Sequence, residues 1–171
     1  AGVGIRRGQI AHRLLEALPA LDEGERAEAA RRYLGRMAAD WSEATREALL
    51  LEVMAVLEDA RFAPFFASGS RAEVGIVGTI TLAERPYTVN GAIDRLAVAE
   101  NGTVHLLDYK TDRPVPAHLG EVPEAYRLQL ALYRELLRPL YLGRPIRAAL
   151  LFTEGPTLID IDDASLDEAL A

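Results

Sequence analysis

The spacing of apolar residues changes at Arg71 from the period of a helix to the period of a strand, and this change constrains the fold more than any other feature. Upstream, Leu, Val, Met and Ala lie on one side and charges on the other, which is typical of packing helices. Downstream, Val, Ile and Thr are enriched and alternate, which predicts strands. We expect helices at 6–21, 22–41, 42–60 and 122–140, and strands at 71–82, 87–100, 103–111, 146–155 and 157–162.

This order of elements predicts an α/β fold with a central mixed β-sheet flanked by helices and a helical N-terminal third. The chain has 171 residues, of which 50% are hydrophobic, enough for one compact core. We therefore predict a single domain over 1–171, with a helical part at 1–60, a turn-rich link at 61–70 and a sheet core at 71–161. Because the chain does not begin with Met, we expect it to be a piece of a longer polypeptide.

Several features are absent from the sequence, and each narrows the class of protein. There is no cysteine, which excludes disulfides and iron–sulfur clusters and fits a cytoplasmic protein. No apolar run reaches the ~18 residues of a membrane span, and no signal peptide is visible. The formal net charge of −7 argues against a domain that grips nucleic acid by a broad basic surface. A metal-dependent site, in which acids hold cations that meet phosphates, stays compatible with this charge.

The stretch "VHLLDYKTDR" ends an apolar strand in charged residues. Asp108 and Lys110 are two apart and therefore point to the same face of that strand. The preceding hairpin decides what faces them, and its Asn101-Gly102 pair is a strong turn signal. A two-residue turn would place Asp94 opposite Tyr109. A three-residue loop from Glu100 to Gly102, with Gly102 left-handed, places Asp94 opposite Asp108 and gathers the apolar residues on one face, so we prefer it.

Two neighbouring carboxylates repel each other and cannot both stay ionised without a cation. A divalent metal resolves the repulsion, since Mg²⁺ takes carboxylate oxygens together with waters and phosphates. Lys110 beside such a metal could steady a nucleophilic water or the charge that develops on phosphorus. An ordinary Asp–Lys ion pair at a strand end is the alternative interpretation.

Four segments in this order resemble the PD-(D/E)xK nuclease superfamily: "GQIAHRLLE", "GAIDRL", "LLDYKTD" and "QLALY". They are most similar to the RecB-type nuclease domain, in particular the C-terminal nuclease domain of the AddA helicase–nucleases. The resemblance implies a restriction-endonuclease-like core. It also implies that Asp94, Asp108 and Lys110 are catalytic, with Gln129 and Tyr133 near the active site. Mg²⁺ or Mn²⁺ would be held by His12, Asp94, Asp108 and the backbone carbonyl of Tyr109.

From the residues alone, some of these assignments have plain alternatives. A lone histidine on an amphipathic helix is more often structural, and this holds for His12. Gln129 and Tyr133 share one helix face by their spacing but would otherwise be unremarkable. Glu73 is an acid on an apolar strand, where the family often has one, so it either supports the metal ligands, faces the substrate or is a surface residue. Arg6, Arg7, Arg113 and Arg127 are candidate contacts for a nucleic-acid backbone.

The function implied by the resemblance is that of a Mg²⁺-dependent deoxyribonuclease, an exonuclease of the AddAB/RecBCD type that serves double-strand-break repair and recombination. The implied partners are DNA, an upstream helicase motor in the parent chain and an AddB-like protein. A strand delivered by a motor would explain how an acidic domain can act on a polyanion. The alternative is a catalytically inactive nuclease fold that binds DNA or another protein of the complex. In a third interpretation, the helices at 22–60 are mainly a docking surface.

Overall fold

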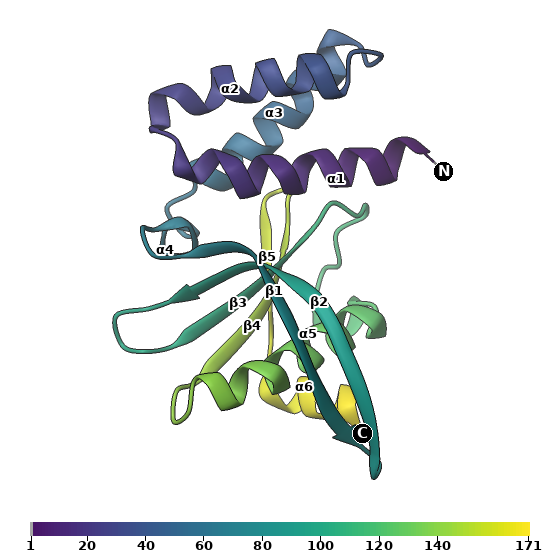
Figure 1. Ribbon diagram of the computed structural model, residues 1–171. Helices are drawn as coiled ribbons and strands as arrows, with labels where there is room; N and C mark the ends of the chain where they lie inside the picture. The colour runs from purple at the N-terminus through teal and green to yellow at the C-terminus, as the bar shows by residue number, and fades with distance from the viewer. Residues whose placement is uncertain (1) are drawn as a thin grey trace.

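The structure is a computed structural model that describes residues 2–171. Residue 1, where the predicted domain begins, lies outside the described residues. The chain forms one five-stranded sheet. Figure 1 shows the N-terminal helices α1 to α3 stacked over one side of it and α5 and α6 on the other. Both the α/β class and the helical N-terminal third agree with the sequence prediction.

The N-terminal part consists of α1 (Gly2–Ala17), α2 (Glu23–Met37) and α3 (Glu43–Glu58). A single 3₁₀ turn at Leu18–Ala20, which contains Pro19, ends α1. Ser42 caps α3, because its hydroxyl accepts the Thr45 N–H at 3.1 Å and so satisfies a free amide of the first turn. The expected link at 61–70 is not all turn: it contains the short helix α4 (Ala63–Phe66), with Pro64 in its first turn.

The sheet has the order β1-β2-β3-β4-β5 and is mixed. The strands β1 to β3 form an antiparallel meander, β4 runs parallel to β3, and β5 is antiparallel to β4. Their bounds are β1 (Arg71–Leu82), β2 (Arg85–Val98), β3 (Val104–Lys110), β4 (Ile146–Phe152) and β5 (Thr157–Ile161). The helix α5 (Glu124–Leu137), which the sequence placed at 122–140, lies between β3 and β4 as their crossover connection. Short 3₁₀ turns flank it at Leu119–Glu121 and Arg138–Leu140.

The helix α6 (Asp163–Leu170) was not predicted, and it follows β5 directly. Asp162 caps it by accepting the Ser165 N–H at 2.7 Å. The side chain of Arg134, which is 1% exposed, joins α6 to α5 by pairing with Asp163 at 2.9 Å and with Asp167. The buried guanidinium is therefore compensated by acids from the helix beside it.

Two hydrophobic clusters cover the two faces of the sheet, because neighbouring strand residues point to opposite sides. Leu107 and Tyr109 of β3 pack with α1, α2 and α3 in one cluster. Leu106 of β3 and Leu150 of β4 pack with α5 and α6 in the other. Within residues 2–171, no helix combines the length and the apolar character needed to cross a membrane.

The β2–β3 hairpin adopts the preferred register. Leu96 lies opposite Leu106, and Val98 lies opposite Val104. The loop has three residues, since Ala99 N–H donates to the Thr103 carbonyl at 2.8 Å. Gly102 has a φ of 86°, the left-handed conformation that glycine adopts without a Cβ penalty. This confirms the expected three-residue loop and its register, in which Asp94 and Asp108 are the next residues beyond the last ladder pair, Arg95–Leu107.

Candidate active site

Asp94 lies where β2 separates from β3. The β2–β3 ladder ends at the pair Arg95–Leu107, one position before Asp94 would meet Asp108. The Asp94 side chain takes over the missing bond, because its Oδ2 accepts the Tyr109 N–H at 2.7 Å. This bond holds the carboxylate in place, and Asp94 as a whole is 8% exposed. A buried amide is satisfied in this way, and the second oxygen of Asp94 is left to meet other groups.

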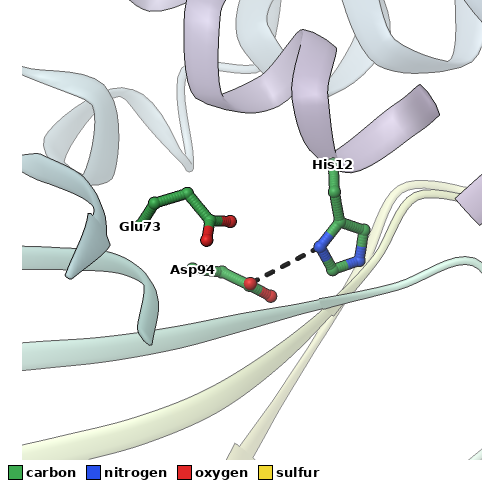
Figure 2. Close-up of side chains that lie close together, drawn as sticks. All are labelled: His12, Glu73 and Asp94. Carbon is green, nitrogen blue, oxygen red and sulfur yellow. Dashed lines mark ion pairs between the residues drawn. The ribbon is translucent and has the colours of Figure 1, made fainter. Parts of the chain in front are cut away.

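Glu73 faces Asp94 from the other side of β2. The neighbouring pairs Ala72–Arg95 and Val74–Ile93 are in register, but the ladder skips Glu73 and Asp94. Glu73 has a φ of 48°, which is costly for a residue with a side chain. This local distortion accompanies a side chain that turns toward Asp94, as Figure 2 shows.

His12 reaches the same place from the helical layer. Figure 2 shows its ring extending from α1 toward Asp94. The His12 Nδ1 atom lies 3.4 Å from Asp94 Oδ1. The ring also packs edge-on against Tyr109, with centroids 5.6 Å apart. His12, Glu73 and Asp94 each offer one ligand atom, and these atoms lie within 4.8 Å of one another. One imidazole nitrogen and two carboxylate oxygens from three separate elements form a donor set that suits a divalent cation.

The electrostatics of this cluster favour a cation. Burial opposes a charge on His12, yet the carboxylates of Asp94 and Asp108, helped by the Tyr109 backbone, raise the pKa of His12 above its ordinary value. Burial and then the nearby Asp94 carboxylate raise the pKa of Glu73 as well. Both shifts reflect unbalanced negative charge in a partly enclosed space. A proton on His12 would balance part of this charge, and a metal ion could take the place of that proton.

Asp108 and Lys110 lie next to this cluster at the end of β3. Asp108 is 5% exposed, and its Oδ2 lies 2.8 Å from the Lys110 ammonium but is buried without an aligned hydrogen bond. Burial and repulsion from Asp94 raise the pKa of Asp108 from 3.8 to about 6, and Lys110 offsets this only in part. Asp108 is therefore close enough to Asp94 for the two carboxylates to repel each other, although it lies outside the group of His12, Glu73 and Asp94.

Tyr126 of α5 helps to fix the position of the Lys110 side chain. The Lys110 ammonium lies 3.9 Å from the centre of the Tyr126 ring, a cation–π contact. The Tyr126 hydroxyl donates to Asp112, and burial together with this bond raises the pKa of Tyr126 to about 12. The Tyr126 side chain is therefore uncharged, and its contacts with Lys110 and Asp112 fix its orientation.

Gln129 and Tyr133 contact each other on α5 and lie against the strand that carries Asp94. Gln129 Nε2 donates to the Tyr133 hydroxyl at 3.3 Å. That hydroxyl lies against the backbone of β2 at Gly91, where an added Cβ would sit 2.3 Å from it. The glycine of "GAIDRL" thus makes room for the tyrosine of "QLALY", so this pair supports the strand that carries Asp94. Gly8 acts similarly for α1, since its Cβ would lie 3.0 Å from Thr111 Oγ1 beyond Lys110.

Three of the four arginines considered for a nucleic-acid backbone already have acidic partners. Arg6 pairs with Asp40 at 2.7 Å, while Arg7 and Arg113 both pair with Glu52. Arg127 lies on α5 and its Nε is buried without a partner among the described residues. Sequence reasoning missed Glu52, which looks like any polar residue of an amphipathic helix.

Comparison with known proteins identifies the family. Residues 3–169 match the model of the PD-(D/E)XK nuclease superfamily. A segment of 102 residues, 60% of this chain, is 34% identical to an ATP-dependent helicase/nuclease from Alkaliphilus oremlandii. That match spans 8% of the length of the relative. The crystal structure of SSO0001 superposes with a TM-score of 0.41 at 17% identity, over 92% of this chain and 71% of that one.

Proposed function

This chain belongs to the PD-(D/E)XK nuclease superfamily, and on that premise we propose that it is a metal-dependent deoxyribonuclease that hydrolyses phosphodiester bonds. One observation carries the proposal: an imidazole from α1 and carboxylates from β1 and β2 converge next to the Asp108–Lys110 pair at the end of β3. A purely structural cluster would be expected to pair each of its acids, whereas here the acids outnumber the cations.

We assign the metal ligands to His12, Asp94 and Asp108, with the Tyr109 carbonyl completing the set and Glu73 close enough to join it. A Mg²⁺ or Mn²⁺ ion bound there supplies a water of lowered pKa and polarises the scissile phosphate. The protein provides the remaining chemistry. Lys110 holds the attacking water and offsets charge on the phosphorus oxygens. Tyr126 keeps the ammonium in place, and Asp94 is oriented by the Tyr109 amide.

The identity of the residue at position 110 supports a chemical role. Of the 19 basic residues in the sequence, Lys110 is the only lysine, and the other 18 are arginines. The Lys110 side chain is 15% exposed and fits between Asp108 and the Tyr126 ring. A compact ammonium with three rotatable donors suits this space, whereas the planar fork of arginine is larger and fixed in geometry.

We further propose that the chain is one nuclease domain of a cytoplasmic helicase–nuclease of the AddAB type that acts as an exonuclease in repair and recombination. The partial similarity to a helicase/nuclease supports this. An upstream motor and an AddB-like protein would then deliver the DNA strand. Delivery would also offset the net charge of −7, which disfavours capture of a free polyanion.

A cleavage assay tests the proposal. End-labelled single-stranded and double-stranded DNA is incubated with the protein and Mg²⁺, Mn²⁺ or EDTA, and the wild type is compared with Lys110→Ala. The exposed Arg144, on the turn before β4, provides the control variant Arg144→Ala. We expect metal-dependent cleavage by the wild type and the control, and none by Lys110→Ala. Full cleavage by Lys110→Ala, or none by the wild type with either metal, would contradict the proposal and favour an inactive binding module.

A further inference from the structure

Glu52, near the middle of α3, binds three segments that are far apart in the sequence. Its carboxylate accepts the Thr153 hydroxyl at 2.6 Å and Arg113 Nη2 at 3.1 Å, and it also pairs with Arg7. The Glu52 side chain is only 11% exposed, so its charge depends on these partners rather than on water. With two guanidinium partners and one hydroxyl partner, the carboxylate uses three of its roughly four acceptor sites.

The partners of Glu52 belong to segments that carry or adjoin residues on both sides of the candidate metal site. Arg7 belongs to α1, five residues before His12 on the same helix. Thr153 directly follows β4, and its N–H donates to the Lys110 carbonyl at 3.0 Å. Arg113 follows Lys110 by three residues and also pairs with Glu154 at 3.1 Å. Glu52 therefore links the helix that carries His12 to the strand end that carries Asp108 and Lys110.

This link matters because the metal ligands come from two different layers of the fold. His12 belongs to the helical layer, whereas Asp94 and Asp108 belong to the sheet. A metal that bridges two layers binds tightly only if the layers are already held at the right separation, because otherwise binding must supply the ordering free energy. The apolar contacts between α1 and the sheet are not directional, whereas the bonds at Glu52 fix both position and orientation.

We propose that Glu52 is a positioning residue that sets the distance between His12 and the carboxylates of the sheet and so preorganises the metal site. This inference rests on the proposed function. Glu52 acts through Arg7 on one side and through Thr153 on the other. Thr153 bonds both Glu52 and the Lys110 carbonyl and so fixes the end of β3. The ion pair between Glu52 and Arg7 fixes α1.

Calorimetric Mn²⁺ titration of the full chain tests the inference, with Glu52→Gln and Thr153→Val as the variants. Glu47→Gln is the matched control: Glu47 lies on the same helix and pairs with Arg31 at 2.7 Å, but this pair joins α3 only to α2. We expect the Mn²⁺ dissociation constant to rise about tenfold or more in Glu52→Gln, as is usual when the support of a metal ligand is lost. Thr153→Val should show a smaller rise, and Glu47→Gln should change it by less than about twofold.

Thermal melting of the metal-free variants separates positioning from simple stability. If Glu52→Gln is folded at the titration temperature and binds Mn²⁺ as tightly as the wild type, Glu52 is structural only and the inference is wrong, while the proposed function stands. Equal weakening by Glu47→Gln would also overturn it, because any loss in α3 would then suffice. If the wild type itself does not bind Mn²⁺, the proposed metal site fails and this inference fails with it.

Discussion

Asp108 should destabilise the metal-free protein at neutral pH, and replacing it with asparagine should relieve this cost. The carboxyl is 5% exposed, lies beside Asp94 and has its pKa raised from 3.8 to about 6. Asparagine has nearly the same shape as a protonated aspartic acid but cannot ionise. The variant Asp108→Asn therefore keeps the packing and removes the charge that the buried site does not favour.

The magnitude follows from the size of the pKa shift. A native pKa above the unfolded value means that the folded state binds the proton more tightly, so this stabilising contribution is complete below about pH 4 and is lost as pH rises through about 6. At about 1.4 kcal/mol per pKa unit, the loss amounts to about 3 kcal/mol. Asp108→Asn does not undergo this loss. Between pH 4 and pH 7, the free energy of unfolding of the variant should therefore rise relative to that of the wild type by about 3 kcal/mol.

Urea denaturation in EDTA at a series of pH values measures the difference, and the exposed Glu100 in the β2–β3 loop gives the control variant Glu100→Gln. The free energy of unfolding of Asp108→Asn minus that of the wild type should rise with pH, whereas the control difference should stay flat. Excess Mn²⁺ should reverse the order, since only the wild type has the full ligand set and ligand binding stabilises the native state. If the difference in the free energy of unfolding between Asp108→Asn and the wild type does not depend on pH, the argument that burial and Asp94 raise the pKa of Asp108 is refuted.

Three further predictions concern His12, Tyr126 and the contact between Gly91 and Tyr133. His12→Ala should weaken Mn²⁺ binding in calorimetry by at least about tenfold, and unchanged affinity would make His12 structural. Tyr126→Leu should lower single-turnover cleavage by about tenfold with Mn²⁺ affinity unchanged, because the ring that holds Lys110 is lost, while Tyr126→Phe should retain most activity. Gly91→Ala should lower the free energy of unfolding by about 1–3 kcal/mol in urea titration, and Tyr133→Phe in the same background should restore part of it.

Much of the fold follows from local patterns in the sequence. The apolar period separated helices from strands, and the Asn101-Gly102 signal with the alternation of Leu96 and Leu106 determined the register of the hairpin. The helix α6 was missed because it is one short element after a strand, although Asp162 and Ser165 carry a capping signal. The link at 61–70 was expected as turns because Pro64 and the glycine at 69 mask the single turn of α4.

The site itself was less accessible to sequence reasoning. The register predicts that Asp94 opposes Asp108, but it cannot show that the ladder opens there and that the Asp94 side chain bonds the Tyr109 amide. The left-handed conformation of Glu73, which turns that acid toward Asp94, has no signal in the sequence. Glu52 contacts residues up to 101 positions away, and such a long-range partner is specified by tertiary packing rather than by a local pattern.

The single lysine offers the most direct test of the central claim, that a divalent metal binds among His12, Glu73, Asp94 and Asp108 next to Lys110. Protein labelled with ¹³C at the lysine ε-carbon gives one side-chain NMR signal, and paramagnetic Mn²⁺ broadens the signals of nuclei close to it. We predict that low concentrations of Mn²⁺ remove this signal in the wild type and leave it sharp in Asp94→Asn. A lysine signal that stays sharp in the wild type while Mn²⁺ is shown to bind would place the metal elsewhere and contradict the claim.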